Sequence, residues 1–300
     1  MARRISALAS VAILAGLWFL PGSASAAPQK RACPDLMAAG GAIVVPAAVG
    51  NYGTMQYGQT VTRRDGEVVL TFDDGPDPQS TPSILDTLDR YCVKATFFFT
   101  GLRAQRHPEL VRETALRGHT IASHTYSHPN NLRRLNWTRA TRQIRRGIEE
   151  IQAALDGAPE TQGLTVAPFF RFPGLNHSGP LRGWLAAQNI STFSCDVGTD
   201  DWRHISSRNV VYRALRNIRT KGGGIVIFHD TKPRTAAALP EVLDGLLAEG
   251  YRVAHMVPET VRPAEAPGSA VALAVPATAT ASPDGLRLEQ APDNSISSAP

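Results

Sequence analysis

Several features that would assign this sequence to a class are scarce or absent. It holds only three cysteines, Cys33, Cys92 and Cys195, and none belongs to a C-x-x-C pair, so a zinc site built from thiolates is not expected. No dense run of lysine and arginine with interleaved aromatic residues predicts a nucleic-acid-binding surface. We find no internal repeat. With 43% hydrophobic residues, the 300-residue chain can form one large domain or two modest ones.

The apolar stretch near the N-terminus is too short to span a membrane as a helix. Arg3 and Arg4 precede the apolar stretch "ISALASVAILAGLWFL", which is shorter than the roughly 20 residues that a spanning helix needs. The small residues "ASA" ending at Ala26 are typical of a signal-peptide cleavage site. We therefore interpret residues 1–26 as a secretory signal peptide, with an uncleaved membrane anchor as the alternative. No cysteine follows a lipobox-like stretch, so no stable anchor is expected after cleavage.

Export would change both the charge and the redox setting of the chain. The formal net charge would fall from +5 to +3, because residues 1–26 contain two arginines and no acidic residue. We expect a periplasmic or secreted protein. In that setting one disulfide can form among the three cysteines and leave one thiol unpaired. The spacing does not fix which pair forms.

Composition divides the rest of the chain. Residues 258–300 are rich in Ala, Pro, Ser and Thr without a sustained period. Such a segment buries too little apolar surface to offset its ordering entropy, so we predict a disordered tail. Residues 27–64 are expected to be an N-terminal extension packed on the main domain, with a short strand at "GAIVVP". The main domain is expected over residues 65–257.

Within the main domain, short apolar runs alternate with segments of helical period. In the predicted helix "NWTRATRQIRRGIEEIQAAL", Ile144, Ile148 and Ile151 recur on one face. This regular alternation predicts an α/β fold, and favours a distorted (β/α) barrel of about seven or eight parallel strands over an open sheet. The predicted strands are "EVVLTF", "KATFFFTG", "HTIASH", "PFFRF", "ISTFSCDV", "GIVIFHD" and "YRVAH".

Polar side chains recur at the end of strand after strand. Because functional groups in α/β barrels gather where the strands end, we expect these side chains to share one site. The residues in these positions are Asp73, Asp74, His124, Arg171, Asp196 to Trp202, and His229.

The segment "HTYSH" indicates a metal site. His124 and His128 are four residues apart, a spacing that brings two imidazoles together on a helical turn. Alone, the pair is equally explained by two histidines that satisfy loop backbone groups. One carboxylate from Asp73 or Asp74 would complete a His₂-carboxylate set with an open position, which is the ligand count of a catalytic divalent metal.

The adjacent carboxylates of Asp73 and Asp74 are expected to take different roles. Two like charges side by side raise the pKa of one of them unless a cation neutralises the other. If Asp74 binds the metal, Asp73 stays ionised and can take a proton from a water that the metal has acidified. If the strand continued, the two side chains would point to opposite faces of the sheet, so we expect the Gly75–Pro76 turn to direct both into one pocket. An ordinary exposed Asp-Gly-Pro turn is the alternative.

Five further residues complete the expected site. Arg171 can pair with the basic carboxylate, and a free N–H at Gly174 can help to bind an oxyanion. His229 is the remaining strand-end histidine and is expected to supply the acid. Asp201 can orient that histidine, and Trp202 can form an aromatic wall for a sugar. Each also has a purely structural interpretation, such as a surface arginine or a half-buried tryptophan.

In their order along the chain, these motifs resemble those of the polysaccharide deacetylases, carbohydrate esterase family 4, with its nodulation-protein-B-like domain. The resemblance covers residues 65 to about 257. It implies that "TFDD" supplies the general base Asp73 and the metal ligand Asp74. It also implies that "HTYSH" supplies the other two ligands, His124 and His128.

The remaining motifs carry roles by the same resemblance. In "RFPG" the arginine, Arg171, contacts the base, and Gly174 lends its N–H to the oxyanion hole. In "DDW" Asp201 tunes the acid and Trp202 lines the groove, and in "IFHD" His229 is the general acid. The family implies a distorted (β/α) barrel, usually zinc, and hydrolytic removal of acetyl groups from sugars. We expect a divalent metal, zinc or cobalt, and removal of N-acetyl groups from N-acetylglucosamine-containing saccharides of the peptidoglycan or chitin type.

One departure from the family pattern concerns Gly174, where many members carry an aromatic residue. The backbone donor is retained, but the change puts substrate preference in doubt. His177, shortly after this motif, can also face substrate. The alternatives are ester deacetylation of an acetylated xylan-type polymer, amide hydrolysis of a small nitrogen compound, and a catalytically silent carbohydrate-binding module.

Overall fold

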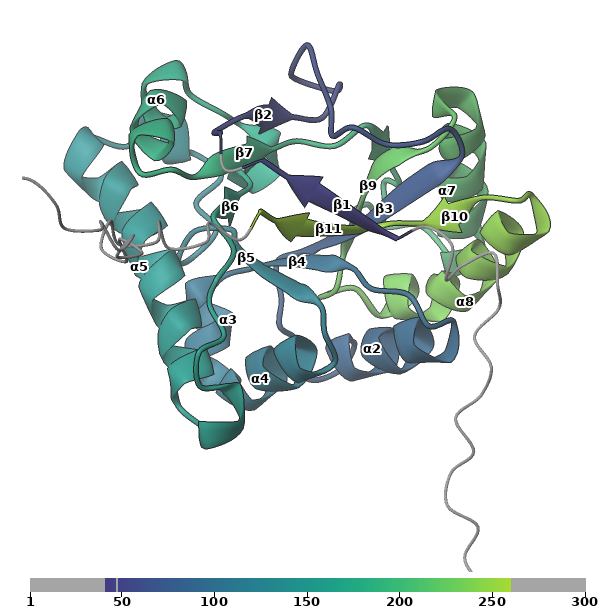
Figure 1. The fold of residues 1–300 in the computed structure, drawn as a ribbon, viewed down its shortest axis with the longest axis horizontal. Coiled ribbons are helices and arrows are strands. Elements are labelled where there is room, and N and C mark those ends of the chain that lie inside the picture. The colour runs from purple at the N-terminus through teal and green to yellow at the C-terminus, as the bar shows by residue number, and fades with distance from the viewer. Residues whose placement is uncertain (1–40, 47, 260–300) are drawn as a thin grey trace, which may run out of the picture. The chain divides into compact units, whose positions relative to one another are not determined.

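A parallel β-sheet runs through the described part of the chain, which is residues 41–46 and 48–259 of the computed structural model (Figure 1). Eight strands follow one another across it, and β10 (Arg252–Val253) pairs with the first residues of β3. β1 (Ala42–Val45) and β11 (His255–Pro258) form a separate parallel pair. In order across the sheet, the eight strands are β2 (Asn51–Tyr52), β7 (Ser191–Phe193), β6 (Phe169–Phe170), β5 (Thr120–Ser123), β4 (Thr96–Phe99), β3 (Glu67–Asp73), β9 (Gly224–His229) and β8 (Val197–Gly198).

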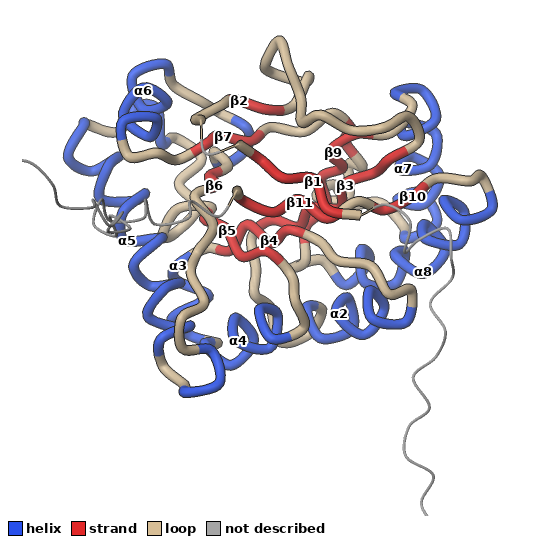
Figure 2. Tube along the Cα trace, in the orientation of Figure 1, coloured by secondary structure: helices blue, strands red, loops and turns tan. Residues whose placement is uncertain are grey.

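The helices lie around the outside of these strands (Figure 2). All strand pairings are parallel, and among the described residues no pairing joins β8 back to β2, so the barrel is open there. These findings confirm the predicted α/β fold and distorted barrel. The α-helices are α2 (Thr81–Arg90), α3 (Gly101–Arg106), α4 (Pro108–Leu116), α5 (Trp137–Asp156), α6 (Gly179–Ala187), α7 (Ser207–Lys221) and α8 (Pro233–Ala248).

Strand β3 shows how the barrel interior is built. All seven of its residues are buried, and its apolar residues belong to two hydrophobic clusters. Leu70 and Phe72 pack in the larger cluster with helix residues, whereas Val69 lies in a second cluster made mostly of strand residues. Because alternate residues of a strand point to the same side, Thr71 and Asp73 continue the row of Val69 into the barrel interior. The strand therefore ends with a carboxylate inside the barrel.

One predicted strand is divided in the structure. The segment "ISTFSCDV" forms β7, which pairs with β2 and β6, and then β8, which pairs with β9. Asp196 lies buried between them, and its carboxylate accepts hydrogen bonds of 2.7 to 2.8 Å from Thr54 N, Thr60 Oγ1 and Ile225 N. These bonds satisfy a buried charge at the point where the chain leaves one strand for the next.

Two smaller differences concern helices and the C-terminal strand. Helix α3 is not among the predicted helices, because it has only six residues and Pro108 begins the next helix directly after it. The predicted strand "YRVAH" is divided into β10 and the start of β11. The strand expected at "GAIVVP" is present as β1.

Several predictions fall on residues that the structure does not describe. The proposed signal peptide (1–26), residues 27–40 and all but the start of the proposed tail (258–300) lie outside the described residues. No helix within 41–46 and 48–259 is long and apolar enough to span a membrane. Cys92 is disulfide-bonded, and Cys195 is a buried free thiol.

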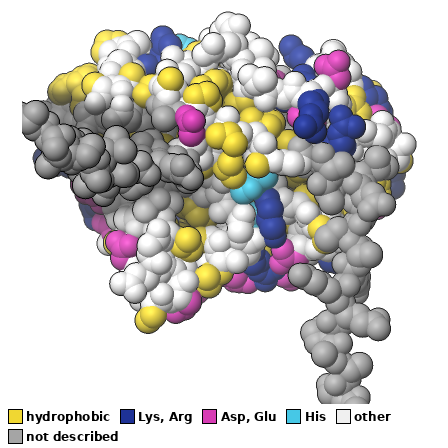
Figure 3. Space-filling model, viewed as in Figure 1, with side chains coloured by type: hydrophobic (Ala, Val, Ile, Leu, Met, Phe, Trp, Pro, Cys, Tyr) yellow, Lys and Arg dark blue, Asp and Glu magenta, His cyan; other side chains and the backbone are white. Residues whose placement is uncertain are grey.

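The surface is mixed in character on the face drawn in Figure 3. Acidic and basic side chains are interspersed there among apolar and uncharged ones.

Candidate active site

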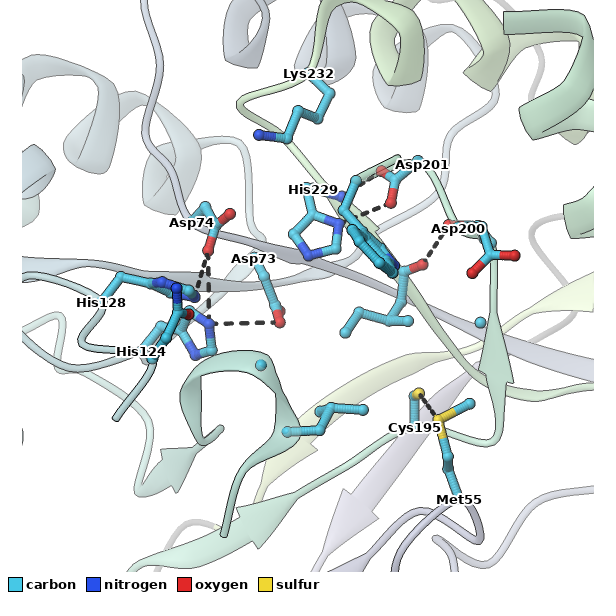
Figure 4. A pocket seen from close by; sticks show the side chains of 17 residues that line it. Met55, Asp73, Asp74, His124, His128, Cys195, Asp200, Asp201, His229 and Lys232 are labelled. Carbon is cyan, nitrogen blue, oxygen red and sulfur yellow. Dashed lines mark hydrogen bonds and ion pairs between the residues drawn. The ribbon is translucent and has the colours of Figure 1, made fainter. Parts of the chain in front are cut away.

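A cavity of about 580 Å³ is lined by residues that end or follow β3, β5, β8 and β9 (Figure 4). Arg171 does not line it and is completely buried beside Asp73. Asp196 and Val197, expected at the same strand ends, do not line it either. The polar side chains at the ends of separate strands are thus brought together, as predicted. The predicted site residues that line the cavity are Asp73, Asp74, His124, His128, Gly174, Asp201, Trp202 and His229.

Asp73 is held inside the barrel by Arg171. The guanidinium Nη1 donates to Asp73 Oδ1 at 2.6 Å and to Thr71 Oγ1 at 2.8 Å, and Nη2 donates to Ser194 O at 2.9 Å. The guanidinium also lies over the ring of Phe98, 4.2 Å from its centroid. Burial raises the pKa of Asp73, and the charge of Arg171 opposes that rise. Asp73 therefore binds a proton more readily than an exposed aspartate does, which suits a general base.

Asp74 reaches the same cavity because the backbone turns at Asp74 itself. β3 ends at Asp73, and Asp74 has a left-handed φ of +79°. The departure from strand geometry therefore begins one residue before the predicted Gly75–Pro76 turn. Behind this turn the buried Asp230 carboxylate lies against Gly75 and accepts a hydrogen bond from Thr81 Oγ1 at 2.7 Å. Burial raises the pKa of Asp230 to about 7.

The two histidines meet on a non-helical turn. Residues 124–128 contain no helix, and Thr125 and His128 have φ values of +71° and +54°. The two imidazole ring centroids are 4.9 Å apart. The predicted proximity of His124 and His128 is confirmed, but the predicted helical turn is wrong, because two left-handed residues curl the chain instead.

Helices α3 and α5 hold this turn in place. Thr125 O accepts a hydrogen bond from Gly101 N at 2.9 Å, and Tyr126 N donates to Gln143 O at 2.8 Å. On α5, Gly147 packs so closely that an added Cβ would lie 2.5 Å from the Thr125 carbonyl carbon. The role of Gly147 is missing from the sequence predictions. A glycine inside an otherwise favourable helix costs about 1 kcal/mol, and that cost is the signal that points to it.

Asp74, His124 and His128 form the candidate metal site of the described residues, with one ligand atom from each within 4.8 Å of the others. Asp74 Oδ1 is 3.6 Å from His124 Nε2 and 3.3 Å from His128 Nε2. This oxygen is buried and has no hydrogen-bond partner among the described residues. A buried, unpartnered carboxylate oxygen that faces two imidazoles fits a divalent cation.

The protonation of His124 also fits a metal ligand. Its Nδ1 lies 2.7 Å from Arg171 O, and because a carbonyl can only accept, Nδ1 donates and Nε2 keeps its lone pair for the cluster. Burial lowers the pKa of His124 to about 3, so the ring is neutral near pH 7.

His229 and Asp201 form a second charged pair in the cavity. Asp201 Oδ1 accepts from His229 Nδ1 at 2.7 Å, and Oδ2 accepts from His229 N at 2.7 Å and Thr235 Oγ1 at 2.6 Å. Burial alone would lower the pKa of His229, but its hydrogen bond to Asp201 and the charge of Asp201 raise it to about 9. Burial likewise opposes ionisation of Asp201, yet its hydrogen bonds lower its pKa. His229 is therefore protonated near neutral pH.

Gly174 offers a backbone donor to the cavity. The hydrogen bonds of the short 3₁₀ turn Pro173–Leu175 are donated by Leu175 N and Asn176 N, and none of the described backbone bonds uses Gly174 N. Gly174 has φ +57°, and an added Cβ would meet only Asn130 Oδ1, at 3.9 Å. The absent side chain therefore leaves open space in the cavity wall. On the rim, Trp202 is 56% exposed.

Other residues near the cavity differ from the sequence predictions. His177 does not line it and packs on Tyr57, with ring centroids 5.3 Å apart. Cys195 lines it, but burial raises the pKa of this thiol to about 12, which excludes it as a thiolate nucleophile near pH 7. Met55, in the predicted N-terminal extension, and Lys232 also line the cavity, and no sequence motif points to either.

Replacing Gly147 by alanine should disturb the histidine turn. We expect Gly147→Ala to lower the free energy of unfolding by about 1–3 kcal/mol, because the new methyl group would overlap Thr125. We also expect it to weaken zinc binding roughly 10- to 100-fold, since the ligands depend on their supporting residues. Denaturant unfolding and calorimetric zinc titration measure the two effects.

The matched control is Gly183→Ala in α6, where an added Cβ meets nothing within 4 Å. It should leave zinc affinity unchanged. Equal zinc affinity in the Gly147→Ala protein and the unmodified protein would contradict the supporting role of α5.

Comparison with known proteins assigns the chain to a family. The polysaccharide deacetylase family model matches residues 60–190. One peptidoglycan-N-acetylglucosamine deacetylase of Bacillus cereus is 37% identical over 192 residues, which make up 62% of this chain and 65% of that protein. A second one is 33% identical over 191 residues, which make up 62% of this chain and 84% of that protein. The solved structure of a peptidoglycan deacetylase of Bdellovibrio bacteriovorus has a TM-score of 0.62 at 32% identity, covering 73% of this chain and 58% of that one. The chain belongs to the polysaccharide deacetylase family.

Proposed function

We propose that this protein is an exported, metal-dependent hydrolase that removes N-acetyl groups from N-acetylglucosamine units of peptidoglycan. The observation that carries this proposal is the content of one cavity: a buried basic carboxylate, a protonated histidine and a three-residue metal cluster. The names of the Bacillus cereus and Bdellovibrio relatives support the substrate. The signal-like N-terminus supports export to where such a polymer lies.

The metal ligands in the proposal are Asp74 Oδ1, His124 Nε2 and His128 Nε2. We propose zinc, with cobalt as a functional substitute, because imidazole and carboxylate ligands suit both ions. When bound, the cation would polarise the acetyl carbonyl and acidify a water molecule.

The protein's own groups would then move the protons. Asp73 accepts the proton of the attacking water, and Arg171 keeps this carboxylate oriented. The Gly174 N–H donates to the oxygen of the acetyl carbonyl as negative charge develops there. His229, held by Asp201, gives its proton to the nitrogen of the leaving amine. Trp202, on the rim, provides an apolar face for a sugar ring.

Two other functions fit parts of the same geometry. Ester deacetylation of an acetylated xylan-type polymer would use the same base and metal, and a chitin-like oligosaccharide carries the same N-acetyl group as peptidoglycan. A silent carbohydrate-binding module is disfavoured by the base and acid pairs, because each buries charged groups that binding alone does not require.

Acetate release tests the proposal directly. We expect the purified protein to release acetate from peptidoglycan and N-acetylglucosamine oligomers, to lose this activity in a chelator, and to recover it with zinc or cobalt. Acetate release from acetylxylan alone would select the ester hydrolase. If metal-loaded protein releases no acetate from any of these substrates, the silent carbohydrate-binding module is the better interpretation.

The two proton-transfer residues can be tested by substitution. Asp73→Asn and His229→Ala should each lower kcat about 10²- to 10⁴-fold, because each removes one general acid or base. Zinc content should remain unchanged, since neither residue belongs to the proposed ligand set. Asp65→Asn, at an exposed turn before the same strand, is the matched control and should retain full activity. Unchanged kcat in either site variant would refute the assigned roles.

The pH profile tests the His229–Asp201 pair. Since the pKa of His229 is about 9, we expect activity to persist through neutral pH and to fall as the pH rises through about 9, where the acid loses its proton. Asp201→Asn removes the negative charge that raises this pKa, so the alkaline limb should move to lower pH by about one unit or more, toward the usual histidine value. An alkaline limb that stays in place would contradict the pairing.

A further inference from the structure

A second cavity, of about 340 Å³, adjoins the active site on its metal side. It shares three lining residues with the main cavity, namely Asp74, His128 and Lys232. A polymer that presents an acetyl group to the metal cluster can therefore extend from one cavity into the other. The remaining lining residues of the second cavity are Thr100, Leu102, Arg103, Arg106, His107, Ser127 and Thr231.

The charges that line the second cavity are mostly positive. Arg103, Arg106 and Lys232 contribute cations, and the one carboxylate in its lining is that of Asp74, which the proposed function assigns to the metal. Arg103 is paired with Asp77 at 2.8 Å. Within residues 41–46 and 48–259, neither Arg106 nor Lys232 forms a salt bridge or a side-chain hydrogen bond. Two cationic side chains are thus left to bind an external group.

Lys232 is positioned by the segment that carries the proposed acid. It caps the start of α8, its N–H donates to His229 O at 3.3 Å, and its carbonyl accepts from Thr235 N at 2.9 Å. In Figure 4 its side chain extends toward the side of the site where Asp74 lies. Its backbone is therefore held next to the proposed acid, while its side chain lies toward Asp74.

The arginines lie on α3, which contacts the turn that carries His124 and His128. Arg103 and Arg106 are three residues apart on α3, a spacing that places side chains on one helix face. The first residue of α3, Gly101, donates through its N–H to Thr125 O in the histidine turn. The cations thus reach the second cavity from α3, which contacts the histidine turn, and from the start of α8, which follows His229.

From this geometry we propose that the second cavity is a subsite for a carboxylate on the part of the glycan next to the deacetylated sugar. The proposal rests on the proposed function and narrows its substrate to an acidic glycan. Chitin-like chains carry no carboxylate, whereas peptidoglycan carries one on the lactyl group of each muramic acid unit or, where peptide is attached there, on the peptide. Cationic side chains that converge on a groove would favour these acidic polymers over neutral ones.

The test is the double variant Arg106→Ala/Lys232→Ala, assayed on three substrates. These are chitotetraose, peptide-free peptidoglycan glycans with free lactyl carboxylates, and peptide-bearing glycans whose lactyl groups are amidated. We expect kcat/KM on acidic glycan, divided by kcat/KM on chitotetraose, to fall about 10-fold or more. A fall confined to peptide-free glycans identifies the lactyl carboxylate, and one confined to peptide-bearing glycans identifies the peptide.

Two further variants separate the effect of the positive charges from the effect of changing the side-chain shape. Arg106→Lys/Lys232→Arg keeps both cations and should restore most of the ratio. Arg90→Ala/Lys221→Ala removes one arginine and one lysine from the exposed C-terminal ends of α2 and α7, and should leave the ratio unchanged. Raising the salt concentration should weaken the preference of the unmodified protein for acidic glycans, because salt screens the attraction.

The subsite would be overturned if the double alanine variant left the ratio of kcat/KM on acidic glycan to kcat/KM on chitotetraose unchanged, whether its kcat/KM stayed the same or fell equally on both substrates. Failure of the proposed function is recognised separately, as absence of acetate release by the unmodified, zinc-loaded protein from all three substrates. In that event calorimetric binding of the same glycans decides the subsite. The unmodified protein should bind acidic glycan more tightly than chitotetraose, and the double alanine variant should lose that difference.

Discussion

The site depends on Arg171, which holds two functional groups with two different parts of the same residue. Its guanidinium binds Asp73 across the barrel interior, and its backbone carbonyl accepts the Nδ1 proton of His124. The first contact keeps a buried carboxylate ionisable, and the second leaves Nε2 of His124, a proposed metal ligand, free. A shift of this one residue would disturb the base and the metal cluster together. Removing one partner of a buried ion pair typically costs about 3–5 kcal/mol, so this pair also constrains the fold.

The two neighbouring aspartates differ because one backbone torsion separates their environments. Asp73 ends the strand and lies inside the barrel beside a cation, whereas Asp74 has a left-handed φ and faces two imidazoles. Burial raises the pKa of Asp73 while hydrogen bonds lower that of Asp201. In the proposed mechanism these carboxylates take separate tasks in one cavity, Asp73 as the base and Asp201 as the partner of the acid.

Much of this arrangement was predictable from the sequence. Alternating apolar runs and helical segments predict the parallel sheet, and polar residues at strand ends predict which side chains meet, because parallel strands end on one side. The division of "ISTFSCDV" was not predictable, since it depends on Asp196 receiving hydrogen bonds from Thr54 and Thr60, more than 130 residues away.

Backbone torsions and helix packing also escaped prediction. The histidine spacing suggests a helical turn, but Thr125 and His128 adopt left-handed conformations instead. Hydrogen bonds of Thr125 and Tyr126 to α3 and α5 hold this turn. From the sequence, Gly147 only weakens α5, but the structure shows that a side chain at this position would overlap Thr125. Lys232 belongs to no motif, and only the structure shows that it lines two cavities together with Asp74 and His128.

The proposed metal ligands are tested most directly by a crystal structure of the zinc-loaded protein, with the ion located by anomalous scattering. We expect one ion bound by Asp74 Oδ1 and the Nε2 atoms of His124 and His128, with Asp73 still paired to Arg171. An ion bound by Asp73, or located away from these two histidines, would contradict it.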